Sequence, residues 1–174
     1  WHYLAPLQEP ESTWKTAPWV RDDWASGPGG IGYGDDDDAT VIEPTLSLYM
    51  RTEFEVVNTQ QILQASLFVD YDDAFIAYLN GEEIARAGIG SPGDSTAFDK
   101  AADGSHEARL FSGSAPDRVE IDAALLVQGE NHLAVQIHNT STTSSDLSSR
   151  VFLAVGVSGE EQTHYKRTNI LDKN

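Results

Sequence analysis

The 174-residue sequence contains no cysteine. This absence excludes thiol catalysis, cysteine-ligated zinc and disulfide bonds, and it leaves the redox compartment undetermined. The sequence also lacks a run of about 18 apolar residues, so it predicts no membrane-spanning helix. No charged segment followed by an apolar one opens the chain, and the first residue is Trp1. We therefore expect a piece excised from a longer precursor. Its expected location, secreted or at the cell surface, is an inference from the type of protein and not from a signal.

Basic residues are few in this chain. The 11 lysines and arginines stand against 28 aspartates and glutamates, which gives a formal net charge of −17. Such a charge would repel a phosphate backbone and an anionic membrane, so neither nucleic acid nor a membrane is an expected partner. A solvated acidic surface, a salty milieu and an affinity for cations are all compatible with it.

Catalytic motifs are also missing. The sequence has no nucleophile elbow, no glycine-rich phosphate loop and no His-Glu-x-x-His helix. Paired carboxylates for glycoside hydrolysis can be imagined among so many acids, but none lies between apolar neighbours that would raise its pKa for general-acid work. We therefore expect a protein that is not an enzyme.

What the sequence does contain is a series of strand patterns. Between residues 48 and 56, Met50, Phe54 and Val56 face one way and the charged residues between them face the other, which predicts a half-buried strand. Another strand ends at Asn80-Gly81, a pair that accepts the positive φ angles of a type I′ hairpin turn. The strands expected beyond residue 56 cover residues 63–69, 75–79, 84–87, 108–111, 119–121, 132–138 and 152–157.

The segments between these strands are predicted to be irregular. The first 45 residues should form ordered loops around one or two short strands, with tryptophans closing the base of a sandwich. Residues 88–106 look too polar and too small to carry a core and are predicted to be a loop, and residues 122–127 suggest a single helical turn. Together these patterns predict an all-β protein, an antiparallel jelly-roll β-sandwich, with one domain over residues 1–159 and a polar tail or linker over residues 160–174.

An acidic cluster directly precedes the strand that ends at Asn80. Asp70, Asp72 and Asp73 would lie at a rim of the sandwich, and carboxylate oxygens are the ligands that calcium prefers. We therefore predict these three aspartates as ligands of a calcium ion. The alternative is that aspartates occupy turns because their side chains bond the local backbone.

The rim is expected to gather further polar residues. If the strand ending at His138 runs antiparallel to the one beginning near Asp73, the exit of the first lies beside the entrance of the second. His138, Asn139, Ser145 and Asp146 would then share the rim with the aspartates, and the run 35–38 could approach the same end. His132 and His138 cannot share one metal ion, because six residues of strand place them about 20 Å apart.

Candidate carbohydrate contacts lie mostly on the predicted loops. Aromatic faces hold the apolar C–H face of a pyranose ring, and Trp19 and Tyr71 are the preferred platform residues, ahead of Trp24 and Tyr33. A guanidinium such as that of Arg86 can clamp vicinal hydroxyls, although a structural salt bridge is the competing interpretation for Arg86 and for Arg51. The predicted carbohydrate-binding residues are Trp19, Tyr71, Arg86, His138 and Asp146.

Several segments, taken in order, carry a family resemblance. They are WVRDDWASGPGGIGYGD, YMRTEFEV, DYDDAFIAYLNGEEIAR, LLVQGENHLAVQIHN and SSDL. This order resembles galactose-binding-domain-like sandwiches, including accessory modules of secreted bacterial enzymes and the sugar-binding domain of family 2 glycoside hydrolases. The Asp72-Asp73 step is also similar to the double-aspartate loop of calcium-dependent lectin-like domains, with Ala74 where those loops usually have glycine.

The resemblance covers about residues 14–157 and implies a non-catalytic carbohydrate-binding or accessory module of a larger secreted bacterial protein. Its expected partners are a polysaccharide or oligosaccharide and the neighbouring domains of a longer chain, and its expected cofactor is calcium. The alternative function is a structural spacer or protein-interaction domain that packs against a catalytic neighbour and has no sugar ligand.

Overall fold

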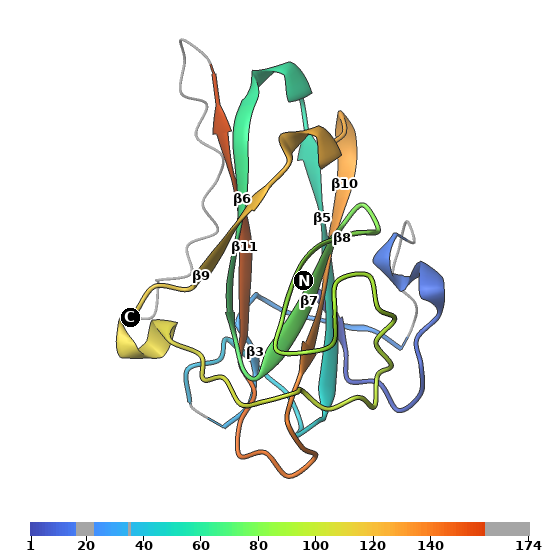
Figure 1. Cartoon of the computed structure of the whole chain (residues 1–174), viewed down its shortest axis with the longest axis vertical. Helices are drawn as coiled ribbons and strands as arrows, with labels where there is room; N and C mark the ends of the chain where they lie inside the picture. Colours follow the sequence, from blue (N-terminus) through green and yellow to red (C-terminus); the bar gives the residue numbers. More distant parts are fainter. Residues whose placement is uncertain (17–22, 35, 159–174) are drawn as a thin grey trace.

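The computed structural model of the protein describes residues 1–16, 23–34 and 36–158 (Figure 1). Within these ranges the chain forms strands and short 3₁₀ turns, and the predicted antiparallel β-sandwich is confirmed. None of the helical segments in these ranges has the length or apolar character needed to cross a bilayer. The strands are β1 (His2–Leu4), β2 (Ala25–Ser26), β3 (Ile31–Gly32), β4 (Thr40–Val41), β5 (Ser47–Val56), β6 (Ile62–Tyr71), β7 (Ala74–Leu79), β8 (Glu82–Ala87), β9 (Asp117–Ile121), β10 (Gly129–His138) and β11 (Ser149–Val157).

Two sheets form the sandwich. The larger has the strand order β2-β1-β5-β10-β7-β8 and the smaller has the order β11-β6-β9, while β3 and β4 form a short parallel pair. The long strands β5, β6, β10 and β11 run along the longest axis of the molecule (Figure 1). The apolar positions predicted by alternation face the other sheet, as Met50, Leu67 and Val135 illustrate with fully buried side chains.

The hairpin between β7 and β8 has the predicted turn. Asn80 has a φ of 52° and Gly81 a φ of 86°, so both central residues adopt the left-handed conformation of a type I′ turn. The Asn80 side chain also accepts a hydrogen bond from the backbone N–H of His132 at 2.8 Å. The turn is therefore tied to β10 as well as closed on itself.

The Asn131 side chain, near the start of β10, holds together the segments at this end of the sheet. It is fully buried, and its amide bonds the backbone of Val127 at 2.8 and 2.9 Å, the carbonyl of Gly129 at 3.0 Å and the side chain of Asn80 at 2.9 Å. We predict that Asn131→Ala lowers the free energy of unfolding by about 2 kcal/mol, because it leaves several of these polar groups without partners. Urea unfolding measures the change.

The matched control for this prediction is Asn58→Ala. The Asn58 side chain accepts a single hydrogen bond, from the N–H of Gln60 on an exposed 3₁₀ turn, so its removal should cost about 0.5–1 kcal/mol. Equal costs for the two variants would contradict the assigned role of Asn131.

A second, smaller core covers the outer face of the larger sheet. Trp14 packs edge-on against Tyr49, with ring centroids 4.8 Å apart, and against Tyr78 at 5.9 Å. Ile89, which is 2 % exposed, joins this cluster together with the partly buried Phe98. Residues 88–106 form a loop, as predicted, but they are not too polar to join a core, because a few apolar side chains of this loop cover the sheet.

Two further expectations need correction. Residues 108–111 do not form a strand but enter a 3₁₀ turn at Leu110–Ser112, because an aspartate from β6 binds the backbone N–H groups that begin it. Within residues 1–45, the described positions already contain four short strands rather than one or two. The helical turn expected within residues 122–127 is present as a 3₁₀ turn at Ala123–Leu125, where the Asp122 side chain caps its start.

Candidate functional site

The acidic rim lies at the end of the sandwich where β6 passes into β7 and β10 leads into β11. His138 pairs with Ala74 across the antiparallel strands, and the backbone N–H of Asp73 donates to the carbonyl of His138 at 3.1 Å. The N–H of Asp72 likewise donates to the carbonyl of Ser148 at 3.1 Å. The strand arrangement assumed in predicting the rim is thus confirmed.

Asp70 and Asp73 use their carboxylates to hold the backbone of neighbouring segments. Asp70 accepts hydrogen bonds from the N–H groups of Arg109 and Leu110 at 2.7 and 2.9 Å. Asp73 accepts from the N–H of His106 at 3.0 Å and from that of Thr140 at 2.7 Å. Both aspartates are buried, so the segment 106–110, which we call the strap, is fixed against the rim by charged hydrogen bonds.

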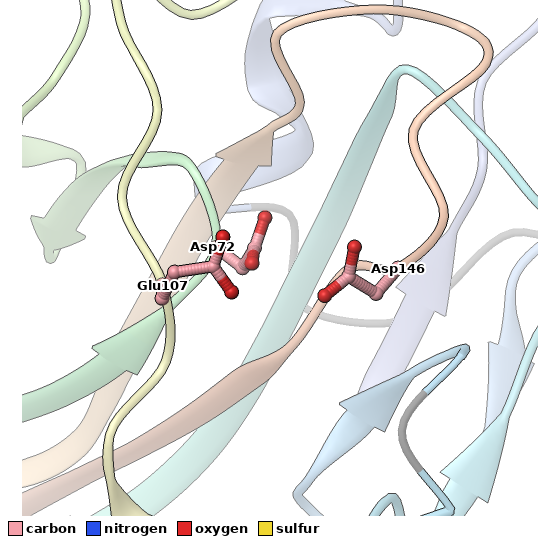
Figure 2. A group of neighbouring side chains, drawn as sticks. All are labelled: Asp72, Glu107 and Asp146. Atoms are coloured by element: carbon pink, nitrogen blue, oxygen red, sulfur yellow. The ribbon is translucent and has the colours of Figure 1, made fainter.

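Asp72 points elsewhere and joins a carboxylate triad. Oxygens of Asp72, Glu107 and Asp146 lie within 4.8 Å of one another, and the three groups converge from three different segments (Figure 2). The peptide bond between Asp72 and Asp73 is cis. Asp72 is buried, Asp146 is half-buried and Glu107 is exposed, so the triad is open to solvent on one side. This arrangement could hold a metal ion.

The triad overlaps only partly with the predicted metal ligands. Asp72 is common to both sets, and Asp70 and Asp73 instead bind backbone donors. Glu107 was missed, because it lies in a segment without periodicity and reaches the rim only through the strap. Three negative charges this close repel one another, and a cation among them would offset that repulsion.

Neutral oxygen atoms are present in the segments that form the rim. The Tyr33 hydroxyl accepts a hydrogen bond from the Asn139 side-chain amide at 2.8 Å. Burial raises the pKa of that hydroxyl, and the charges of Asp146 and Asp72 raise it further. The side-chain oxygens of Asn139 and Ser148 are buried and have no hydrogen-bond partner in the described part of the chain. They are available as additional ligands or as partners for water.

The four-aspartate run was expected to approach this end, and the segment that precedes it does reach the rim. Tyr33 and Leu147 form a backbone bridge, and Gly34, with a φ of 110°, lies so close to Asp146 that a Cβ atom would clash with it. The first residue of the run lies outside the described ranges. Asp37 pairs with Arg150 at 3.0 Å and does not belong to the triad.

Tyr71 does not offer its ring to solvent. It is 4 % exposed, and its ring stacks on His106 with centroids 4.1 Å apart. Its hydroxyl donates to Asp117 at 3.3 Å, and burial, reinforced by the charge of Asp117, raises the pKa of Tyr71 to about 12. Trp19, the other preferred platform residue, lies outside the described residues.

Arg86 forms a structural salt bridge, which was the alternative to a sugar contact. Its side chain is 3 % exposed and forms a paired salt bridge with Glu83 at 2.8 and 2.9 Å. This hydrogen-bonded pairing lowers the pKa of Glu83. Arg86 also donates to the carbonyls of Ile89 and Asp94, so it fixes the loop after β8. Arg51 is similarly buried and donates to Trp14 and Glu53.

His138 is fully buried beneath the same loop. Its Nδ1 donates to the carbonyl of Lys100 at 2.8 Å, because a carbonyl oxygen can only accept. Burial lowers the pKa of His138 to about 4. Of the four described residues predicted to contact carbohydrate, Tyr71, His138 and the side chain of Arg86 are buried in internal contacts, and Asp146 lies at the accessible rim.

Comparison with known proteins gave similarities of structure alone. No family model matches the chain, and no curated protein sequence matches it. Among solved structures, the chain is similar to part of a Streptomyces avermitilis α-L-rhamnosidase complexed with L-rhamnose, with 17% identity and a TM-score of 0.47 over 66% of this chain. It is also similar to part of a Bifidobacterium dentium β-glucuronidase complexed with coumarin-3-O-glucuronide, with 20% identity and a TM-score of 0.47 over 79% of this chain.

The chain spans only 9% of that rhamnosidase and 19% of that glucuronidase. A β-glucuronidase from an uncultured Clostridium gives a TM-score of 0.46 at 16% identity, with 80% of this chain and 21% of that one covered. The chain is therefore similar in structure to a portion of several large glycoside hydrolases. The likeness concerns the β-sandwich and says nothing of a ligand.

Proposed function

We propose that this protein is a non-catalytic carbohydrate-binding or accessory module of a larger secreted bacterial protein, and that its rim binds calcium. The observation that carries the proposal is the convergence of Asp72, Glu107 and Asp146 at the rim, with one side of the triad accessible to solvent. The sequence resemblance to sugar-binding sandwiches supports the carbohydrate part. Secretion and the lack of catalysis belong to the same proposal.

Calcium fits this group of ligands for chemical reasons. The ion takes six to eight oxygen ligands at about 2.3–2.6 Å in an adaptable geometry. Three carboxylates supply the charge, and the buried side-chain oxygens of Asn139 and Ser148, which have no hydrogen-bond partner in the described part of the chain, are neutral candidates. The remaining positions on the solvent side would be filled by water or by two vicinal hydroxyls of a sugar. A calcium ion would also connect the strap to the β6–β7 and β10–β11 connections.

We predict that calcium raises the thermal midpoint of the protein and that chelation reverses the increase. A ligand that binds only the folded state stabilises it by about 2.7 kcal/mol at one hundred times its dissociation constant. Glu107→Gln and Asp146→Asn should abolish most of this response, because each removes a charged ligand. In chelator, both variants should be at least as stable as the parent protein, since they relieve repulsion within the triad. Scanning calorimetry with and without calcium measures both effects.

Glu130→Gln is the control for these variants. Glu130 is 59% exposed at the start of β10, at the opposite end of the sandwich, and its replacement removes the same charge. Its calcium response should match that of the parent. An unchanged midpoint on chelation, together with no bound metal in elemental analysis, would exclude the calcium site.

The carbohydrate part is tested by native gel electrophoresis through soluble polysaccharides and by retention on insoluble ones, each with calcium and with chelator. Calcium-dependent retention that is lost in Asp146→Asn supports sugar binding at the rim. Calcium binding without any retention would leave the ion as a structural element only.

A spacer or protein-interaction domain is a second candidate function, favoured by the opposite end of the sandwich. Val57 and Leu63 are each 70% exposed there, and Val157 is 40% exposed. Apolar side chains gathered at one end are typical of a surface that packs against another domain. Failure to retain any polysaccharide, with or without calcium, favours this function over the first.

A further inference from the structure

Three polar side chains on the outer face of the larger sheet are buried beneath the loop after β8 without hydrogen-bond partners. The Tyr49 hydroxyl, the Gln136 side-chain oxygen and the Nε2 atom of His138 are shielded from solvent, and none of them bonds another group in the described part of the chain. The three residues are 0%, 3% and 0% exposed. Buried polar atoms in folded proteins nearly always have a partner, either in the protein or in ordered water. These three atoms therefore need a partner from outside the chain.

The sheet places the three side chains next to one another. Tyr49 on β5 and Gln136 on β10 occupy directly paired positions, so their side chains project from the same face at neighbouring sites. His138 follows Gln136 by two residues on β10 and shares that face. The ring centroids of Tyr49 and His138 lie 6.4 Å apart, with their planes inclined by 61°. The three polar groups thus belong to one layer between the sheet and the loop.

The loop after β8 closes this layer from the outside. His138 donates through Nδ1 to the carbonyl of Lys100 at 2.8 Å. On either side of Lys100, Phe98 and Ala102 pack against the apolar cluster on the outer face of the sheet. The N–H of Ala102 donates to the carbonyl of Asn139 at 2.9 Å, just beyond the end of β10. The layer is therefore enclosed, and its contents exchange with solvent only when the loop opens.

The three polar atoms offer one donor and two acceptors. Since Nδ1 of His138 carries the proton that bonds a carbonyl, Nε2 is an acceptor. The Gln136 oxygen also accepts, and the Tyr49 hydroxyl can donate. Burial raises the pKa of Tyr49, and the charges of Glu9 and Asp99 raise it further, so the hydroxyl keeps its proton. A water molecule has two hydrogens to donate and an oxygen that accepts, which is the complement of this set.

We propose that Tyr49, Gln136 and His138 bind one internal water molecule. Its oxygen accepts from the tyrosine hydroxyl, and its two hydrogens go to the Gln136 oxygen and to Nε2 of His138. A cation is a poorer occupant, because the positive charges of Lys100 and Arg86 act on His138. An anion would face two acceptors, and an apolar molecule would leave all three groups unpartnered. The inference is independent of calcium binding and of carbohydrate binding.

Tyr49→Phe is the first test, because it removes the hydroxyl and keeps the ring that packs against Trp14. If water bonds the hydroxyl, a hydrogen bond is lost, and we expect the thermal midpoint to fall by about 2–4 °C. If the hydroxyl has no partner, phenylalanine removes a buried unsatisfied group, and the midpoint stays the same or rises. Tyr78→Phe is the matched control, since Tyr78 belongs to the same cluster but its hydroxyl is not among the buried atoms without a partner. Its midpoint should change little.

Oxygen-17 relaxation dispersion of the solvent detects the internal water directly. Water molecules that are held inside a protein raise the amplitude of the dispersion, whereas surface water does not. We expect Gln136→Leu to lower this amplitude relative to the parent protein, because leucine occupies the space of the amide and offers no acceptor. Tyr78→Phe should leave the amplitude unchanged, and thermal midpoints confirm that each variant is folded.

A high-resolution crystal structure of the parent protein completes the test. Density for one water within hydrogen-bond distance of all three atoms supports the inference. A direct hydrogen bond between any two of these atoms, with no water among them, overturns it, and so does density that belongs to an ion. A Tyr49→Phe midpoint at or above that of the parent, or an unchanged dispersion amplitude in Gln136→Leu, also overturns it. None of these outcomes bears on the calcium site, whose own test uses chelation.

Discussion

Replacing Asp73 by alanine is expected to lower the free energy of unfolding by about 4 kcal/mol. The carboxylate of Asp73 is 4% exposed and accepts hydrogen bonds from the N–H groups of His106 and Thr140. Removing a buried charged acceptor leaves both donors without a partner, at a cost of about 1.5–3 kcal/mol each. Because these bonds connect the strap and the start of the β10–β11 connection to the β6–β7 connection, both segments should loosen together.

Chemical denaturation in chelator measures this loss without any contribution from a metal ion. Asp122→Ala is the matched control, since the Asp122 carboxylate accepts one hydrogen bond, from the N–H of Ala124 on the surface, and its loss should cost about 1 kcal/mol. The competing interpretation, in which Asp73 is a calcium ligand, makes a different prediction. In that case the destabilisation would appear with calcium and largely disappear in chelator.

The strap links this stability prediction to the triad. Asp73 fixes the backbone of His106, and Asp70 fixes that of Arg109, so the two aspartates hold the segment on either side of Glu107. Loosening the strap would displace Glu107 from the other two carboxylates. Asp73→Ala should therefore also weaken the calcium response, although Asp73 contributes no ligand. Asp70 and Asp73 are thus positioning residues for the triad.

Much of the fold could be predicted from the sequence because its signals are local. Alternation along β5 and β10 follows from the strand period of two, and the Asn80-Gly81 turn follows from backbone sterics. The shared rim then follows from antiparallel pairing of β7 with β10. None of these inferences requires knowledge of how distant loops fold.

The roles of the rim aspartates could not be predicted, because a carboxylate can bind a cation or a backbone N–H equally well. Which of the two it binds depends on what the fold brings to it. The strap brings N–H groups to Asp70 and Asp73 and brings Glu107 to Asp72. Since the strap has no periodic pattern, sequence alone gives no indication of where it lies.

The outward face of the larger sheet shows a second limit of sequence-based prediction. Alternation correctly places Gln136 and His138 on the face opposite the core, but the loop after β8 covers that face and buries both residues. One signal was available, since residues 74–79 form an unbroken apolar run that is buried on both sides. Such a run is typical of a strand covered on both faces, and it indicates that something lies over this sheet.

His138 leads to the second large effect that we expect, a loss of stability in acid. The histidine lies among Tyr49, Lys100 and Arg86, and its Nε2 has no hydrogen-bond partner in the described part of the chain. Burial, together with the positive charges of Lys100 and Arg86, favours the neutral ring, and the pKa of His138 falls to about 4. An unfolded chain carries a histidine with an ordinary pKa of about 6.5.

Between pH 6.5 and pH 4 the unfolded chain therefore binds a proton that the folded protein does not. Above pH 6.5 the neutral His138 does not lower the free energy of unfolding. As the pH falls below 6.5, the free energy of unfolding decreases by about 1.4 kcal/mol per pH unit. The expected total is about 3 kcal/mol at pH 4. Urea unfolding across this range, compared with the same series for His138→Leu, isolates the contribution, because every other titrating group is common to both proteins.

His138→Leu should be less stable than the parent at neutral pH, since the carbonyl of Lys100 loses its donor, and the gap should narrow steadily in acid. The titration of the His138 ring protons by NMR gives an independent reading that does not depend on the variant. A ring that titrates near pH 6.5 in the folded protein would contradict the prediction and would show that the loop after β8 opens to water. A ring that stays neutral to about pH 4 would place this loop, held by Arg86, among the firmly closed parts of the fold.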